Sequence, residues 1–192
     1  MSSASYAQRV SRPVGWWGMA VFVATEATIF GSLIGTYFYL RFHTSPWPPH
    51  GIPAPRVLAP VLLTLGLVTT SVAMQLAFRS ARRDRVGLTR ALLFLALAVQ
   101  VAYLILQLHS YLVDLGDFSP NATAYASIYF TLTGAHHAHV FVGILLTAWI
   151  QLRLLTRITP YRLVGLQSIV FYWHFVNALA LVVTLVQIFP TL

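Results

Sequence analysis

The chain has 192 residues, of which 58% are hydrophobic and only 8% are charged, and its formal net charge is +8. Water-soluble domains carry about 25% charged residues, so this composition excludes an ordinary soluble domain and indicates a membrane protein. The absence of cysteine excludes disulfides, thiolate-bound zinc, iron–sulfur clusters and thiol catalysis, and the arginines lie in short clusters between apolar runs, without any nucleic-acid-binding motif.

Five apolar stretches are long enough to cross a bilayer, whose hydrocarbon core of about 30 Å needs roughly 20 residues of helix. They run approximately from Gly15 to Leu40, Val57 to Phe78, Ala91 to Val113, Ser127 to Leu152 and Leu163 to Phe189. The connections between them are short. The sequence therefore predicts an all-α, polytopic bundle of five transmembrane helices, with residues 1–192 forming a single membrane domain.

The first predicted span contains Glu26, the only acidic residue within the five stretches. It lies about eleven residues into the helix, roughly 16 Å deep at about 1.5 Å per residue, which is close to the membrane midplane. A carboxyl group in such surroundings is expected to be hydrogen-bonded or protonated, because desolvation penalises its charged form. A bond to a neighbouring helix, proton transfer, and contact with lipid or another subunit are all consistent with this position.

The connection after the first span, HTSPWPPHGIPAPR, is too rich in proline to continue a helix. Its Trp47, together with Trp16 and Trp17 at the start of the first span, is typical of the aromatic belt at a membrane interface. We therefore expect this loop to lie at one membrane surface.

Arginines in the connections predict the orientation, because cytoplasmic loops of membrane proteins carry an excess of positive charge. With five spans, ten of the twelve arginines fall on one side of the membrane. The ten are Arg9, Arg12, Arg79, Arg82, Arg83, Arg85, Arg90, Arg153, Arg157 and Arg162, and the other two are Arg41 and Arg56. The N-terminus is therefore predicted to lie inside and the C-terminus outside. Four of the ten are also candidates for contacts with acidic lipid headgroups, namely Arg79, Arg82, Arg83 and Arg85.

Histidines in the last two predicted spans are the remaining candidates for chemistry. The fourth span contains TGAHHAHVFVG, residues 133–143, and the fifth contains YWHFVN, residues 172–177. At about 100° per residue, His136 and His139 share a face with Thr133 and Gly143, whereas His137 points away from them. Such a stripe of small and hydrogen-bonding residues is typical of a close contact between membrane helices.

Helix depth places His174 near the level of Glu26, with His136 and His139 slightly above it. The sequence therefore predicts an intramembrane polar cluster of these four side chains, with a structural or proton-related role. Two histidines and a carboxylate are also a plausible iron or zinc set, so a free-standing haem or metal redox protein is an alternative. A transporter or proton channel built around Glu26 is disfavoured, because the sequence shows no broken helices or inverted repeats.

Four motifs, in order, resemble those of subunit III of the haem–copper oxidases, the cytochrome c and quinol oxidases of respiratory chains. The first span resembles the family segment G-M-x-x-F-x-x-x-E, with Glu26 at the intramembrane glutamate, and WPPHGI resembles the family loop W-P-P-x-G-I. The fourth span matches T-G-x-H-x-x-H-V-x-x-G, and the fifth matches Y-W-H-F-V-D except that Asn177 replaces the aspartate. The resemblance runs from about Gly15 to the C-terminus.

This resemblance implies an accessory, non-redox subunit of a proton-translocating terminal oxidase, with no catalytic, cofactor or metal site of its own. Haem and copper would lie in partner subunits I and II, with a small subunit IV as an optional further partner. The chain would stabilise the catalytic subunit, bind phospholipid and support proton uptake, and it would bind no nucleic acid. Many bacterial members have five helices instead of seven, which points to a multi-pass protein of the bacterial inner membrane. The related accessory subunit of nitric oxide reductases shares these motifs and is the nearest alternative.

Overall fold

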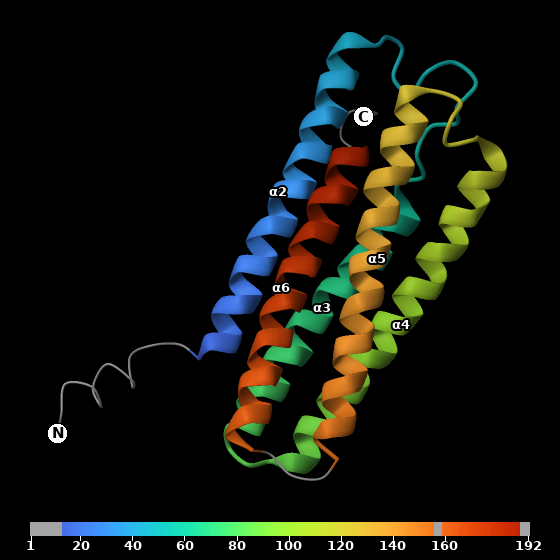
Figure 1. The fold of residues 1–192 in the computed structure, drawn as a ribbon. Coiled ribbons are helices and arrows are strands. Elements are labelled where there is room, and N and C mark those ends of the chain that lie inside the picture. The colour runs from blue at the N-terminus through green and yellow to red at the C-terminus, as the bar shows by residue number, and fades with distance from the viewer. Residues whose placement is uncertain (1–12, 156–158, 189–192) are drawn as a thin grey trace.

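The computed structural model describes residues 13–155 and 159–188, and these form five long helices (Figure 1). The helices are α2 (Val14–His43), α3 (Leu58–Ala81), α4 (Val86–Asp117), α5 (Ala124–Arg153) and α6 (Pro160–Ile188). All five are long and apolar enough to cross a membrane. The predicted all-α bundle of five membrane helices is therefore confirmed. Four residues used in the predictions lie outside the described ranges, namely Arg9, Arg12, Arg157 and Phe189.

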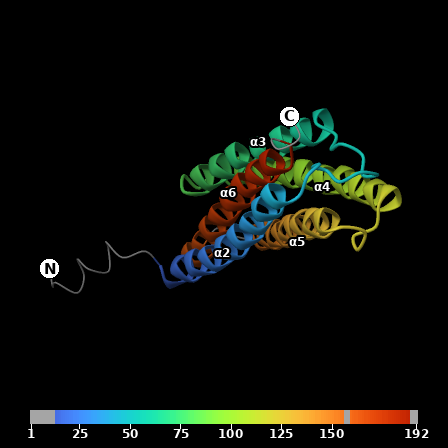
Figure 2. The ribbon, with the colours of Figure 1, turned by 90° about the horizontal axis from the view of Figure 1, so that it is seen from above.

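Four of the helices form a closed ring, in which α3 packs on α4, α4 on α5, α5 on α6, and α6 back on α3. The fifth, α2, lies outside this ring and packs against α5 and α6 (Figure 2). Helices α5 and α6 therefore have neighbours on more sides than the others. Polar residues of α5 and α6 can therefore contact partners on two separate helix faces, one toward α2 and one toward the inside of the ring.

The connections gather at two ends of the bundle (Figure 1). One end carries residues 44–57 and 118–123 and is here called the Pro-rich end. The other end carries residues 82–85, 154–155 and 159 and is called the Arg-rich end. At the Arg-rich end Asp84 has a φ of 54°, a left-handed conformation that aspartate tolerates better than most residues. This residue closes the tight turn between α3 and α4.

Large apolar side chains cover the outward faces of the helices. Examples from four helices are Leu65, Leu95, Leu145 and Leu185, and each is more than half exposed. Such a continuous apolar surface would be unstable in water but is the surface that a helix presents to lipid.

Trp173 of α6 is the largest fully buried side chain, and it fills the space between α5 and α6. Its indole Nε1 donates a hydrogen bond of 2.7 Å to the hydroxyl of Thr147 on α5. A Cβ atom placed on Gly143 would lie only 2.7 Å from the Trp173 ring. The close helix contact expected for the Gly143 stripe is therefore present, and it depends on the missing side chain at that position.

Trp47, which the sequence places in an interfacial aromatic belt, is instead buried in the protein. Its Nε1 donates to the Tyr37 hydroxyl at 3.2 Å, and its ring packs edge-to-face on Tyr37 and Tyr125. The Pro-rich loop is thereby folded back over the ends of α2 and α5. A pattern of tryptophans at span ends cannot distinguish lipid contact from contact with a neighbouring helix.

Candidate functional site

A contact between a carboxyl group and an imidazole joins Glu26 of α2 to His139 of α5. The carboxylate Oε2 lies 2.9 Å from Nε2 of the imidazole. Both side chains are mostly buried, with 16% of Glu26 and 18% of His139 exposed. The ring of Phe30 packs edge-to-face on the imidazole with 5.1 Å between centroids, so the pair is shielded on its α2 side by an aromatic side chain.

The other nitrogen of His139 defines how protons are arranged in this pair. Nδ1 lies 2.8 Å from the backbone carbonyl oxygen of Ala135. A carbonyl oxygen only accepts hydrogen bonds, so Nδ1 must carry a proton. Nε2 then either accepts from a protonated Glu26 or donates to its carboxylate. In both cases one proton lies between the two side chains.

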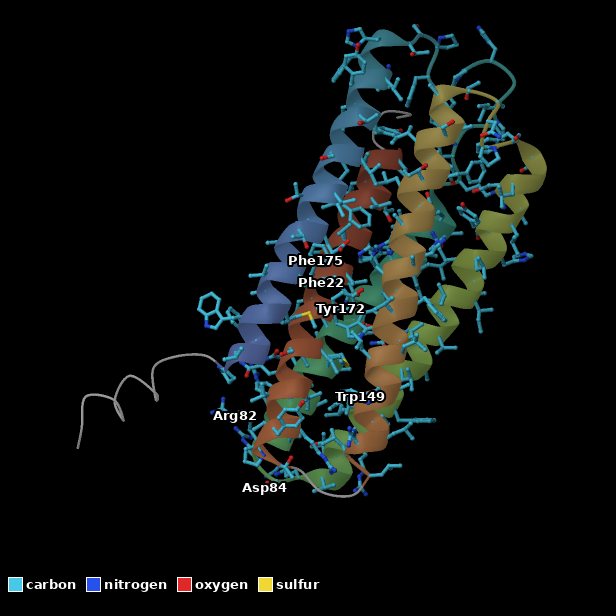
Figure 3. All side chains as sticks on the ribbon, in the orientation of Figure 1. Phe22, Arg82, Asp84, Trp149, Tyr172 and Phe175 are labelled. Atoms are coloured by element: carbon cyan, nitrogen blue, oxygen red, sulfur yellow. The ribbon has the colours of Figure 1, made fainter. Side chains whose placement is uncertain are left out.

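Helix α6 completes the surroundings of the pair from a third direction. The hydroxyl of Tyr172 donates to the backbone carbonyl of His139 at 2.9 Å. The Tyr172 ring also lies beside Phe22 of α2, with 6.3 Å between centroids (Figure 3). Helices α2, α5 and α6 are therefore in contact around the Glu26–His139 pair. These contacts orient both the imidazole and the carboxylate.

The other two histidines of the fourth span face the inside of the ring. His136 is buried, and its Nε2 lies 3.2 Å from the hydroxyl of Tyr103 on α4. His137 is also buried, and its ring packs edge-to-face on Tyr111 of α4. The sequence places His137 away from His136 and His139. In the structure His136 and His137 instead both face α4, with 6.2 Å between their ring centroids, and His139 is the one that faces α2.

His174, the fourth member of the predicted cluster, lies on an exposed part of α6. Its Nε2 is 3.2 Å from Oε1 of Gln75 on α3. The structure thus brings Glu26 and His139 together, while His136 and His174 have Tyr103 and Gln75 as their hydrogen-bond partners. Across residues 13–155 and 159–188, no three His, Asp or Glu side chains are placed to hold a metal ion. The iron or zinc set considered from the sequence is not assembled there.

The arginine cluster lies at the Arg-rich end, where all four of its side chains are exposed. Arg79, Arg82 and Arg83 line a shallow surface hollow at the end of α3, and Arg85 precedes the first turn of α4. Figure 3 shows Arg82 and Asp84 at this extremity of the bundle. Three guanidinium groups around one hollow form a site of positive charge next to the apolar surface of the helices.

Two polar residues of α4, Tyr103 and Gln100, lie inside the ring of helices but could not be identified as site residues from the sequence. Tyr103 is the partner of His136, and Gln100, one turn away, is completely buried. Both lie in the long apolar run ALAVQVAYLIL, where single uncharged polar residues are common on any face. Pairing Tyr103 with His136 would have required knowing that α4 and α5 are neighbours.

Comparison with known proteins agrees with the motifs. A family model described as cytochrome c oxidase subunit III matches residues 4–189. The cytochrome c oxidase subunit 3 of Thermostichus vulcanus is 29% identical over 164 residues, which cover 84% of this chain and 80% of that protein. The subunit 3 of Pongo pygmaeus is 28% identical over 169 residues, and the match spans 64% of its length. A "Heme-copper oxidase subunit I+III" of Aeropyrum pernix is 29% identical over 143 residues, covering 71% of this chain and 17% of that protein.

Proposed function

The chain belongs to the cytochrome c oxidase subunit III family, and on that premise we propose that it is the accessory, non-redox subunit of a respiratory haem–copper terminal oxidase. Such an oxidase couples oxygen reduction to proton translocation. The observation that carries the proposal is the family match over residues 4–189, nearly the whole chain. The 192 residues would form one membrane domain, with haem and copper held by the partner subunits.

Subunits I and II are the proposed partners, with a small subunit IV as an optional fourth. The Aeropyrum pernix relative, whose name places subunits I and III in one polypeptide, supports direct contact with subunit I. Purification through an affinity tag on this chain tests the proposal. The eluate should contain a haem–copper catalytic subunit and show the optical spectrum of its haems. If the tagged chain never co-purifies with such a subunit, or if the isolated chain itself holds stoichiometric haem, the proposed function is wrong.

For the Glu26–His139 pair we propose a role in assembly, lipid retention and sustained turnover of the oxidase, and no direct role in oxygen chemistry. Glu26→Gln keeps a hydrogen bond within reach, because the amide can donate to Nε2 of His139, but it removes the titratable proton. Glu26→Leu removes both. Thr25→Val, in the same turn of α2 but on its exposed face, is the matched control.

These variants separate a structural role from a proton-related role. All three oxidases should retain their haem content. Glu26→Leu should assemble poorly or lose this subunit during purification. If the pair only holds helices together, Glu26→Gln should behave like wild type; if its proton matters, Glu26→Gln should show a normal initial rate of oxygen consumption that decays faster with repeated turnover. Immediate loss of oxygen reduction with all subunits and haems present would contradict the proposal.

We further propose that the Arg-rich end lies inside, in a bacterial inner membrane. The bias of arginines toward that side supports this orientation. Because the chain has no cysteine, Arg83→Cys and His50→Cys introduce single thiols at exposed positions of the two ends. A membrane-impermeant maleimide applied to intact spheroplasts should label the cysteine at position 50 and spare that at position 83. The reverse pattern would invert the topology.

The hollow lined by Arg79, Arg82 and Arg83 is proposed to bind the headgroup of an acidic phospholipid. Guanidinium groups match phosphate geometry, and basic clusters at the inner membrane surface attract anionic lipids. The Arg82→Gln, Arg83→Gln double variant should retain less anionic lipid per purified complex, as measured by lipid mass spectrometry. Arg56→Gln, at the Pro-rich end, is the control and should retain the wild-type amount. Equal lipid content in both would contradict the assignment.

A further inference from the structure

The inside of the ring formed by α3, α4, α5 and α6 holds polar atoms that have no hydrogen-bond partner in the described part of the chain. Gln100 is fully buried, with 0% exposed, yet neither its amide nitrogen nor its amide oxygen is bonded. His136, 3% exposed, leaves Nδ1 unpaired, and His137, 7% exposed, leaves Nε2 unpaired. Leaving a buried donor or acceptor unpaired is unfavourable, so several of them together point to a ligand that pairs with them.

Gln100 belongs to a continuous polar stripe along α4. Gln100, Tyr103, Gln107, Tyr111 and Asp114 recur every three or four residues and therefore lie on one face of the helix.

This face of α4 packs against α5. The Tyr103 hydroxyl meets His136, the Tyr111 ring meets His137, and Asp114 accepts a 2.7 Å hydrogen bond from the hydroxyl of Tyr129. The polar seam thus runs between α4 and α5 from the middle of the bundle to its Pro-rich end.

A pocket opens at the Pro-rich end of this seam. It has a volume of about 110 Å³, and Gln107, Tyr111, Asp114, Thr133 and Gln187 are among its lining residues. Roughly 10–15 Å³ of such volume holds one water molecule, so the pocket has room for several. The side-chain oxygen of Gln107 is buried and unpaired. Gln107 lies one helical turn from Tyr103 and two turns from Gln100, which links the pocket to the unpaired groups deeper in the ring.

We propose that this seam is a binding site for a file of ordered water molecules. The file begins in the pocket beside Gln107 and continues inward to His136, His137 and Gln100. Water fits the chemistry because it both donates and accepts. The oxygen atoms of Gln107 and Gln100 need a donor, while the amide nitrogen of Gln100 needs an acceptor. A cation would satisfy only the acceptors, an anion only the donors, and an apolar molecule neither. The inference does not depend on which complex the chain belongs to.

Radiolytic footprinting in ¹⁸O-labelled water tests the proposal on the intact complex in its native membrane. Hydroxyl radicals formed from a bound water modify the adjacent side chain even where bulk solvent has no access. Tyr103 and Tyr37 are matched tyrosines, 4% and 1% exposed, and both have a hydrogen-bonded hydroxyl. Tyr103 should incorporate labelled oxygen and Tyr37 should not. Equal background labelling of the two tyrosines would overturn the proposal.

A substitution then tests how far the water file reaches. Gln100→Leu replaces the amide by a side chain of similar size that can neither donate nor accept a hydrogen bond, and labelling of Tyr103 should be lost. Gln75→Leu on α3, whose side chain contacts His174 instead of the seam, should leave Tyr103 labelled. Unchanged labelling in Gln100→Leu would overturn the inner part of the file. If that variant fails to assemble, the comparison of Tyr103 with Tyr37 in the wild-type complex decides alone.

Discussion

Replacing Gly143 by alanine should destabilise the bundle, because the added methyl group has no room. Its Cβ would lie 2.7 Å from Cζ2, 3.0 Å from Cε2 and 3.2 Å from Cη2 of Trp173. The indole cannot easily move aside, since it is fully buried and its Nε1 is bonded to Thr147 at 2.7 Å. Either α5 and α6 separate slightly, or the indole tilts and weakens its hydrogen bond.

The size of the effect follows from two opposing contributions. Overpacking a well-filled core costs about 1–3 kcal/mol, whereas alanine gains about 0.8–1.0 kcal/mol over glycine in a helix interior. Gly66→Ala on α3 measures the second contribution alone, because nothing lies within 4 Å of a Cβ added there. The difference in unfolding free energy between the two variants should therefore be about 1–3 kcal/mol, or about a 5- to 140-fold change in the unfolding equilibrium constant.

Unfolding by sodium dodecyl sulfate in mixed micelles, followed by far-UV circular dichroism, measures this difference on the purified chain. Gly143→Ala should unfold at a lower detergent fraction than Gly66→Ala. Equal midpoints for the two variants, or a Gly143→Ala chain that is the more stable one, would refute the reasoning that Trp173 is held in place against α5.

Two further predictions concern the ends of helices. Thr123→Ala should lower the unfolding free energy by about 1 kcal/mol, because the Thr123 hydroxyl caps α5 by accepting a hydrogen bond from the amide of Ala126 at 3.1 Å. Thr123→Ser, which keeps the hydroxyl, should have the stability of the wild type in the same detergent titration. A Thr123→Ser chain as unstable as Thr123→Ala would count against a capping role. Arg90→Met should make the chain at Leu154 and Leu155 more accessible to protease, because the guanidinium donates to the carbonyls of these two residues at 2.7–3.0 Å. Hydrogen bonds to charged groups contribute about 1.5–3 kcal/mol. A cleavage rate equal to that of wild type would show that these bonds do not protect Leu154 and Leu155.

The number and order of the helices could be predicted because hydropathy over about 20 residues measures the property that lets a helix cross a bilayer. Their ends could not be predicted in the same way. Helix α4 begins at Val86 instead of Ala91 and ends at Asp117 instead of Val113. Helical hydrogen bonding continues into the polar residues at both ends, where the average hydropathy has already fallen.

For the candidate site, the depth of the residues in the membrane could be predicted, but their partners could not. Depth along a helix depends on residue count alone, so Glu26 could be placed near the level of His139. The contacts of a side chain also depend on its direction around the helix axis and on which neighbouring helix lies in that direction. His136 and His139 differ by only about 60° around α5, yet this turns one toward Tyr103 on α4 and the other toward Glu26 on α2. The ring arrangement of the helices, which no local pattern encodes, makes that choice.

The position of α2 outside the ring has a consequence for biosynthesis. Glu26 and His139 are 113 residues apart in the chain, and α2 packs on α5 and α6, the last two of the five helices to leave the ribosome. A lone charged side chain at the bilayer centre costs about 2.5–3.5 kcal/mol on insertion scales. We therefore expect the nascent α2 to stay with the insertion machinery, or to enter the lipid with an unmatched carboxyl group, until α5 has been translated. In this order of folding, α2 would be the last of the described helices to pack, after α5 and α6 have formed.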